Sequence, residues 1–291
     1  MLKMRYEWHP ITVDEVKKRA WHERVAETSV KNSQFFVITQ NGEPKELIGF
    51  QHLDWDSKLL GLRTGRVTEM VQLGDSHPSY ETLTHHFEKQ GYDYVTARRP
   101  LGEWPRLQSL EAAGFRIVDG MTTMTKRLEP AEYEATGARL TVTDDAMRVA
   151  AVALASFKGT RYHNDPILTN EQSQRIHWEW AKNSCLGINA KAVWIIEGGG
   201  QVQGFVACKV VGSSGIIDLI AVSPDAAGQG VGRRLVTQAC HYATGQGCRD
   251  LTVQTQTDNY PAFRLYTRCG FEVVTASTTL RWASRDSKHS G

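Results

Sequence analysis

Three glycines at alternate positions, Gly228, Gly230 and Gly232, give the clearest chemical signal in the sequence. They follow an apolar run over residues 216–222 and precede a segment with the apolar spacing of a helix. Glycine allows positive φ angles and a close approach of the backbone to a ligand. Successive amide groups at a helix N-terminus form a positive site for a pyrophosphate. The spacing therefore predicts a phosphate-binding loop, although a flexible turn before a helix needs no ligand.

Two other phosphate-binding motifs compete for this loop. A P-loop is excluded, because no Gly-Lys-Ser/Thr sequence follows the glycines. A dinucleotide-binding fold needs an acidic residue about 20 positions further on, at the end of the next strand. Asp250 lies near that distance, but it precedes the strand-like run that begins at Leu251. The dinucleotide-binding fold is therefore kept as the second interpretation of the loop.

A tyrosine on an amphipathic segment is the second chemical signal. Residues 251–253 predict a strand, and a polar loop leads from it to Asn259. The segment that follows contains Tyr266 and ends at Gly270, as a helix with a glycine C-cap would. An aromatic residue at this spacing also suits the apolar core face of a helix. The residues alone therefore leave open whether the tyrosine has a chemical role or only packs in the core.

Together, the two stretches resemble motifs A and B of the GNAT family of N-acetyltransferases. Motif A is usually written Q/R-x-x-G-x-G/A, and the glycine loop matches it except that Ala227 replaces Gln or Arg. Because the family's loop holds pyrophosphate mainly through backbone amides, this departure weakens the match only slightly. Residues 259–271 are similar to the motif B signature N-x-x-A-x-x-x-Y-x-x-x-G-F. The resemblance implies a GNAT fold for residues 139–283.

The resemblance also implies acetyl-CoA as co-substrate and assigns roles to individual residues. Tyr266 would be the general acid that protonates the departing CoA thiolate. Asp218 is the candidate general base, although strand alternation can turn it away from the site and relatives often use a chain of waters. From the residues alone, Arg233 and Arg234 can both add positive charge to the phosphate pocket. The residues implied to bind the cofactor are Ile220, Ala221, Val222, Ala227, Gly228, Gln229, Gly230, Val231, Gly232, Arg233, Asn259 and Ala262.

A polar loop that contains Arg161, Tyr162 and His163 is the candidate acceptor site. Arginine suits a phosphate group through paired charge-assisted hydrogen bonds. Tyr162 is expected to stack on a base or sugar, and His163 is a further candidate base. The alternative is a solvated surface loop. Trp178 and Trp180, further along, are expected to pack in the core.

The first half of the chain resembles the second. Residues 107–118 align with residues 263–274, and in each copy a helix-like segment ends at glycine before an apolar run. The first copy has Leu110 where the second has Tyr266. The segment that begins Asp54-Trp55-Asp56 is similar to the start of the dTDP-fucosamine acetyltransferase branch of the family, which acetylates a nucleotide-linked amino sugar.

These patterns predict an α/β protein with two GNAT-like mixed-sheet domains in tandem, of which the first is degenerate. The expected domains are residues 1–135 and 139–283, joined by a linker within 129–137 and followed by a disordered tail, 284–291. Further expected elements are helices over 13–29 and 78–90, strands over 34–39, 47–53, 92–97 and 140–142, and a turn at Asn41-Gly42.

Composition limits the classes of function. Hydrophobic residues make up 41% of the chain, and its net charge of +2 gives no argument for nucleic acid or an anionic membrane. No run approaches the ~18 apolar residues of a membrane helix, and the N-terminus does not resemble a signal peptide. The five cysteines form no CxxC pair. We therefore expect a cytoplasmic protein with reduced thiols and without a metal site.

The predicted function is N-acetyl transfer from acetyl-CoA to a primary amine. The preferred acceptor is an amino sugar, especially a nucleotide-linked one, or another small amine. An antibiotic or peptide N-acetyltransferase and a CoA-binding regulatory module are the alternatives. The expected partner is the small-molecule acceptor, with no nucleic acid and no membrane, and a homodimer is left open.

Overall fold

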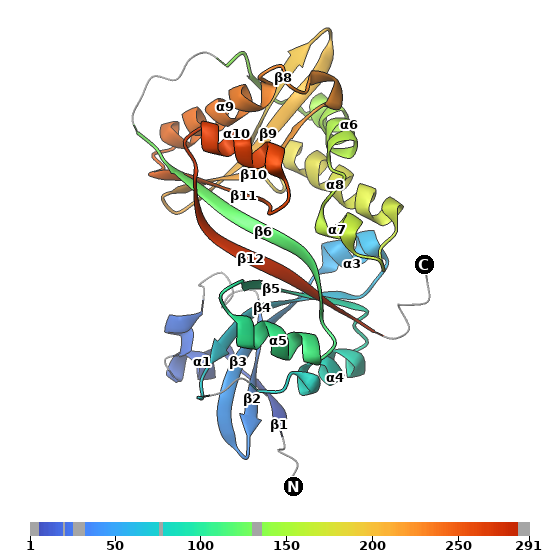
Figure 1. Ribbon diagram of the computed structural model, residues 1–291, viewed down its shortest axis with the longest axis vertical. Coiled ribbons are helices and arrows are strands. Elements are labelled where there is room, and N and C mark those ends of the chain that lie inside the picture. Colours follow the sequence, from blue (N-terminus) through green and yellow to red (C-terminus); the bar gives the residue numbers. More distant parts are fainter. Residues whose placement is uncertain (1–5, 20, 26–32, 76–77, 130–135, 285–291) are drawn as a thin grey trace. The chain divides into compact units, whose positions relative to one another are not determined.

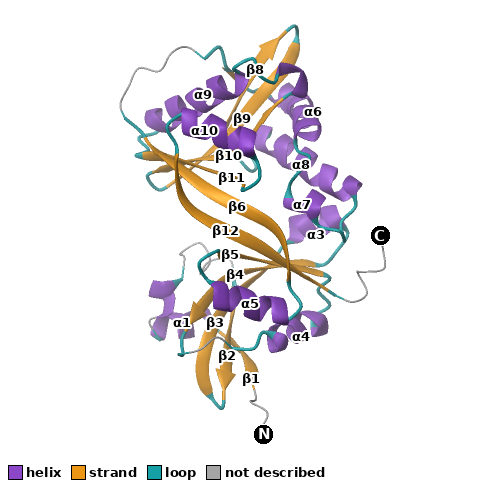
Figure 2. Ribbon diagram, in the orientation of Figure 1, coloured by secondary structure: helices purple, strands orange, loops and turns teal. Residues whose placement is uncertain are grey.

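The computed structural model describes residues 6–19, 21–25, 33–75, 78–129 and 136–284. The chain divides into two compact units (Figure 1). Unit 1 comprises residues 1–119 and 277–291, and unit 2 comprises residues 120–276. Both units mix helices and strands (Figure 2). Most of the linker and tail expected from the sequence, residues 130–135 and 285–291, lies outside the described residues.

Unit 1 contains a sheet with the strand order β1-β2-β3-β4-β5-β12. Its strands are β1 (Tyr6–Ile11), β2 (Gln34–Gln40), β3 (Glu43–His52), β4 (Thr64–Gln72), β5 (Tyr94–Pro100) and β12 (Glu272–Ala283), which enters this unit at Ser277. Its helices are α1 (Val13–Lys18), the 3-10 turn η1 (Trp21–Arg24), α3 (Asp54–Leu60), α4 (Glu81–Lys89) and α5 (Trp104–Ala112). Helices α4 and α5 cover one face of the sheet over a core that includes Phe87, Leu110 and Phe115.

Two local expectations for unit 1 have different outcomes. The turn at Asn41 and Gly42 is confirmed, because both residues have positive φ angles, 52° and 83°, as a tight hairpin requires. The helix expected over 13–29 is shorter: α1 begins after a capping box at Thr12 and ends at Lys18. The 3-10 turn η1 follows, and residues 26–29 lie outside the described part of the chain.

Unit 2 contains a sheet with the strand order β6-β11-β10-β9-β8-β7. Its strands are β6 (Arg116–Arg127), which enters this unit at Gly120, β7 (Arg139–Leu140), β8 (Ala192–Gly198), β9 (Gln201–Val211), β10 (Ser214–Val222) and β11 (Asp250–Gln256). Its helices and 3-10 turns are η2 (Thr143–Asp145), α6 (Ala146–Ser156), α7 (Arg161–Asn164), α8 (Asn170–Cys185), η3 (Pro224–Ala226), α9 (Val231–Gly245) and α10 (Tyr260–Arg268). Separate cores lie on the two faces: α9 and α10 cover one, and α6 and α8 cover the other (Figure 2).

The last strand of each half of the chain pairs in the sheet of the other half. Strand β6 follows α5 but pairs antiparallel with β11, and β12 follows α10 but pairs antiparallel with β5. The registers of the two exchanged strands are equivalent. Thr122 in β6 pairs with Thr255, and Thr278 in β12 pairs with Arg99. Residues 122 and 278 are 156 positions apart, and so are residues 99 and 255. This exchange places the unit boundaries at 119/120 and 276/277, whereas the sequence pattern places a boundary at 135–139.

A β-bulge interrupts the equivalent strand in both halves. The register of β10 against β9 shifts between Ile217 and Leu219, which leaves Asp218 as the extra residue. The register of β4 against β3 shifts in the same way around Thr68. Parallel pairing with the following strand stops at the residue before each bulge. The strands diverge from there, as expected where a bulge bends one strand.

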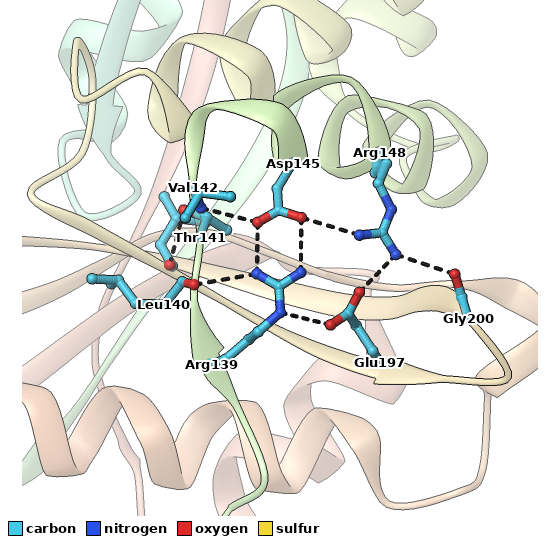
Figure 3. Close-up of polar contacts among 9 residues, drawn as sticks. Arg139, Leu140, Thr141, Val142, Asp145, Arg148, Glu197 and Gly200 are labelled. Carbon is cyan, nitrogen blue, oxygen red and sulfur yellow. Dashed lines mark hydrogen bonds and ion pairs between the residues drawn. The ribbon is translucent and has the colours of Figure 1, made fainter.

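A network of ion pairs links β7, α6 and β8 of unit 2 (Figure 3). Asp145 accepts two hydrogen bonds from the Arg139 guanidinium, at 2.7 and 2.9 Å, and one from Arg148 at 3.1 Å. Both arginines also bind Glu197 on β8. The two guanidinium groups hold the pKa of Asp145 down, to about 2. The network therefore joins β7, α6 and β8.

Candidate cofactor and acceptor site

The divergence of β10 from β11 exposes backbone groups beyond the bulge. Ile220, Ala221 and Val222 pair with β9, and among the described strands their pairing with β11 has already ended. The Val222 carbonyl accepts a hydrogen bond of 2.9 Å from the Ser156 hydroxyl, which helps to fix this end of β10 to α6. An extended ligand with amide groups can pair with such an unpaired strand edge.

The glycine loop has the geometry of an anion site at the start of α9. Gly228 and Gly230 both have φ angles of +77°, which L side chains rarely adopt. Gly230 is the N-cap and provides no side-chain cap, so the first amides of α9 have no capping partner. A Cβ atom on Gly228 or Gly230 would meet nothing within 4 Å. At Gly232, a Cβ would lie 3.1 Å from Leu265, so this glycine allows α9 to pack closely against α10.

Side chains of the loop take up different positions. Gln229 donates a hydrogen bond to the Asp225 carbonyl and stabilises the turn, while Ala227 is exposed. Arg233 is exposed on the first turn of α9. Arg234 donates a hydrogen bond of 2.7 Å to the Thr136 carbonyl. The expectation that Arg234 adds its charge to the phosphate pocket is corrected: its guanidinium is used to hold the segment before β7.

Tyr266 lies in the core between α10 and the sheet. Its side chain is 3% exposed and packs in the cluster that also contains Val231 and Val253, with Phe271 at 5.6 Å between ring centroids. Burial raises the pKa of the phenol, so the group stays protonated at neutral pH. Among the described residues, its hydroxyl has no hydrogen-bond partner. The ring is therefore fixed by packing, and the phenol stays protonated.

Asn259 is the N-cap of α10, a role that needs no ligand. Its side-chain oxygen accepts a hydrogen bond of 3.2 Å from the Ala262 amide. The side chain is exposed, so its NH₂ group can still donate to a bound molecule. Ala262 is half-buried and packs against the same core cluster as Tyr266. Both residues implied to bind the cofactor thus lie at the start of the helix that carries the tyrosine.

Asp218 lies at the bulge and accepts hydrogen bonds from two donors that the sequence did not identify. Its carboxylate accepts a hydrogen bond of 2.6 Å from Lys209 on β9 and one of 3.1 Å from the Trp180 indole on α8. Trp180 also packs against the core cluster on this face of the sheet, as expected from the sequence. A lysine within the apolar run of β9 was the available signal for Lys209, but its partner depends on the register between β9 and β10.

The acceptor loop forms α7 and packs against α8. The Arg161 guanidinium lies 4.3 Å from the centre of the Tyr162 ring and donates a hydrogen bond to its hydroxyl. Tyr162 is only 5% exposed, and its ring meets His177 edge-on. We therefore correct the expectation that Tyr162 stacks on a ligand: one ring face is covered by Arg161, and the ring supports that arginine instead. His163 is half-buried and bonds the Thr160 hydroxyl at 3.0 Å.

His177, beneath this loop, makes the stability of unit 2 depend on pH. It is buried between Phe157 and His163, with ring centroids at 5.0 and 5.3 Å, and burial lowers its pKa to about 4. Between this value and the ordinary pKa of histidine, the unfolded chain binds a proton that the folded chain does not bind, so acid favours unfolding. We expect His177 to remove about 2 kcal/mol of unfolding free energy between pH 7 and pH 4.5.

Urea unfolding of wild type and His177→Gln at the two pH values measures this effect. The variant is expected to be less stable at pH 7, because the ring stack is lost, but to lose less stability on acidification. His85→Gln is the matched control, since that ring is exposed on α4. An equal loss of stability on acidification in wild type and His177→Gln would contradict the prediction.

Comparison with known proteins shows which family the site residues resemble. Residues 159–271, which include the acceptor loop, the bulge, the glycine loop and Tyr266, match the model of the acetyltransferase (GNAT) family. These residues of the second half are therefore similar to a GNAT acetyltransferase domain. In the described part of the chain, no helix is long and apolar enough to span a membrane.

Three relatives are all weakly similar to the chain. The spore coat polysaccharide biosynthesis protein SpsD of Bacillus subtilis is 31% identical over 127 residues, which cover 44% of each chain. A mycothiol acetyltransferase of a Nocardioides species is 26% identical over 228 residues, 74% of this chain and 69% of the relative. The dTDP-fucosamine acetyltransferase of Escherichia coli is 25% identical over 193 residues, 66% and 81% of the two chains. The chain thus spans less than half the length of SpsD.

A solved structure extends the match to both halves. The tandem GNAT protein from the clavulanic acid biosynthesis pathway superposes with a TM-score of 0.62 at 14% identity, over 96% of this chain and 98% of that one. At this identity the likeness shows the fold. The expected fold class is confirmed: the chain is an α/β protein with two GNAT-like units in tandem.

The first GNAT-like unit has a glutamate where the second has Gly204 in β9, and a tyrosine where the second has the N-cap glycine of α9. By strand register, Glu46 in β3 corresponds to Gly204 in β9, and Tyr80 at the N-cap of α4 corresponds to Gly230 at the N-cap of α9. Glu46 is fully buried and accepts hydrogen bonds of 2.6 Å from the Tyr80 hydroxyl and 2.9 Å from Arg106. A carboxylate of the protein itself therefore lies beneath this helix N-terminus.

Proposed function

We propose that the chain transfers the acetyl group of acetyl-CoA directly to a primary amine, within the second GNAT-like unit. The main support is one combination in that unit: β10 diverges from β11 at a bulge, and the uncapped glycine loop at the start of α9 lies next to the helix of Tyr266. The loop has room for a pyrophosphate, and the open edge of β10 suits the amide groups of pantetheine. Acetyl-CoA is thus the proposed co-substrate.

The proposed reaction needs a general base and a general acid, and we assign these roles to Asp218 and Tyr266. The amine nitrogen attacks the thioester carbonyl, the C–N bond forms, and the C–S bond breaks. Asp218 is proposed to accept the proton of the amine, directly or through water. Tyr266 is proposed to donate its proton to the thiolate as it leaves, since a buried phenol with a raised pKa is a proton donor at neutral pH.

A nucleotide-linked amino sugar is the proposed acceptor. The support is the similarity to dTDP-fucosamine acetyltransferase, which includes most of the length of that relative. Arg161, held against the Tyr162 ring, is proposed to bind a phosphate of the acceptor. The acceptor of mycothiol acetyltransferase is the second candidate, because that match covers the largest share of this chain among the three relatives. Antibiotics, peptides and a purely regulatory use of CoA remain the alternatives to these two.

The same proposal covers the organisation and setting of the protein. Residues 1–135 are proposed as the degenerate GNAT-like half and 139–283 as the catalytic half, in sequence order, with their last strands exchanged. A cytoplasmic location is supported by the five cysteines, all of which are free thiols. The proposed partner is a small amine, without nucleic acid, and a homodimer is left open.

The test uses release of the CoA thiol with dTDP-fucosamine as acceptor. We expect the wild-type chain to turn over this substrate, and Arg161→Ala to raise its KM by about 10- to 100-fold. This range corresponds to the loss of one charge-assisted hydrogen bond. The KM of acetyl-CoA should stay the same. Arg161→Lys should recover only part of the loss, because lysine cannot form the paired contacts of a guanidinium.

Arg175→Ala is the matched control, since this arginine is exposed on α8. It should leave both KM values unchanged. Turnover with an unchanged acceptor KM in Arg161→Ala would remove this loop from the acceptor site and favour an amine without phosphate. Binding of acetyl-CoA without turnover of this amine, glucosamine or a basic peptide would favour the regulatory alternative.

A further inference from the structure

The ion pair between Lys209 and Asp218 combines a lysine with the residue proposed as general base. The lysine Nζ lies 2.6 Å from Oδ1 of Asp218, and the Trp180 indole N–H lies 3.1 Å from Oδ2. The Asp218 side chain is 13% exposed and that of Lys209 35% exposed. The pair lies at the bulge, on the sheet face that α6 and α8 cover. Each carboxylate oxygen thus already has one donor.

Such a pair affects the charge of an amine that enters the site. A primary amine is mostly an ammonium ion at neutral pH, and only its free base can attack a thioester. A lone, largely buried carboxylate would stabilise the ammonium form, because an opposite charge nearby favours the charged state of a group. A cation bound to the same carboxylate removes most of this attraction. The free base then forms at a lower pH.

We propose that Lys209 is a positioning residue of the acceptor site: its cation offsets the Asp218 carboxylate, so that the incoming amine is presented as a free base. Trp180 contributes by fixing the second carboxylate oxygen, which keeps the pair in place. The inference rests on the proposed function, because it requires an amine acceptor at the bulge. It assigns to Lys209 and Trp180 a role that the sequence motifs do not contain.

The other titratable groups on the packed elements add little net charge. On α8, Glu179 and Lys182 pair with each other at 3.2 Å, and His177 is buried with a lowered pKa, so it is neutral. On β9, burial raises the pKa of the Cys208 thiol, so that group is also neutral. On α6, Arg148 is bound by Asp145 and Glu197. The exposed Glu171 and Arg175 near the start of α8 have opposite charges.

The pH profile of kcat tests the inference, because kcat reports groups that titrate in the substrate complex. The probes are dTDP-fucosamine and glucosamine at saturating acetyl-CoA. Lys209→Met should move the acid limb to higher pH by on the order of one pH unit, because the ammonium ion then faces an uncompensated carboxylate. Asp218→Asn should lower the plateau and move the limb to lower pH, because the unpaired Lys209 cation repels the ammonium ion. Lys209→Arg should keep the position of the limb.

Lys182→Met is the matched control: it also removes a lysine from an ion pair near Trp180 and should leave the profile unchanged. Lys209→Gln provides a second variant in case Lys209→Met does not fold. A lower plateau without a shift of the limb in the Lys209 variants would show a merely structural ion pair and overturn the inference alone. Failure of wild type to acetylate either amine at any pH would overturn the proposed function and, with it, this inference.

Discussion

Tyr266→Phe should lower kcat by about 10²- to 10⁴-fold, the usual contribution of a positioned general acid. The Kd of acetyl-CoA should remain close to that of wild type. The hydroxyl is needed only as the thiolate leaves, so its loss affects the transition state and not ground-state binding. Phenylalanine preserves the buried ring and its contact with Phe271, so the fold should also be preserved. Stopped-flow or steady-state thiol release measures kcat, and calorimetry measures binding.

Tyr242→Phe is a suitable control, because this ring lies on α9 against Trp194, in the same core cluster but away from the loop. It should leave kcat unchanged. Turnover at the wild-type rate in Tyr266→Phe would mean that the thiolate takes its proton from water and that Tyr266 is only a core residue.

Gly230→Glu should abolish binding of acetyl-CoA. The substitution places a carboxylate at the N-cap of α9, where the pyrophosphate is proposed to bind, and the two negative charges repel each other. Part of any loss will come from backbone strain, since Gly230 has a φ angle of +77°. Gly247→Glu separates the two effects. Gly247 has a φ angle of +74° and equally open space around its Cβ position, but it follows the C-terminus of α9.

Titration calorimetry gives the affinity and also the stoichiometry. We expect one acetyl-CoA per wild-type chain, none for Gly230→Glu, and one for Gly247→Glu. The reason for a single site is that Tyr80 replaces the N-cap glycine in the first unit, and its hydroxyl binds the buried Glu46 carboxylate. Two equivalents of acetyl-CoA per chain would show that this replacement does not close the first unit. Unchanged affinity in Gly230→Glu would place the phosphates elsewhere.

Local patterns in the sequence predicted the parts of the site that depend on backbone geometry. Alternate glycines indicated the loop, because its backbone has positive φ angles at Gly228 and Gly230, and glycine adopts such angles readily. The aligned repeat indicated two related halves, since a helix closed by glycine and followed by a strand is a local unit. The register of Asp218 was open, because a bulge changes the face of a strand without a clear sequence signal.

Features that depend on contacts between distant residues were missed. The partner of Lys209 follows from the strand register, and the burial of Tyr162 follows from the packing of α7 on α8. Neither is encoded in the neighbouring residues. Arg234 shows the same limit: it lies next to the predicted pocket in sequence, but its guanidinium contacts a segment 98 positions away. The exchange of the last strands was also not predicted, because a repeat aligns copies without specifying which sheet each strand joins.

The exchange means that no single cut in the chain releases a complete half. A fragment that ends in the linker would retain β6 without β11 and would lack β12, so β5 would become an open sheet edge. The complementary fragment would have the reverse defect. An exposed strand edge promotes association with other chains. Each excised fragment should therefore associate with its counterpart. If the two halves arose by gene duplication, the exchange of strands would make each copy necessary for the fold of the other, even where one copy has no cofactor loop.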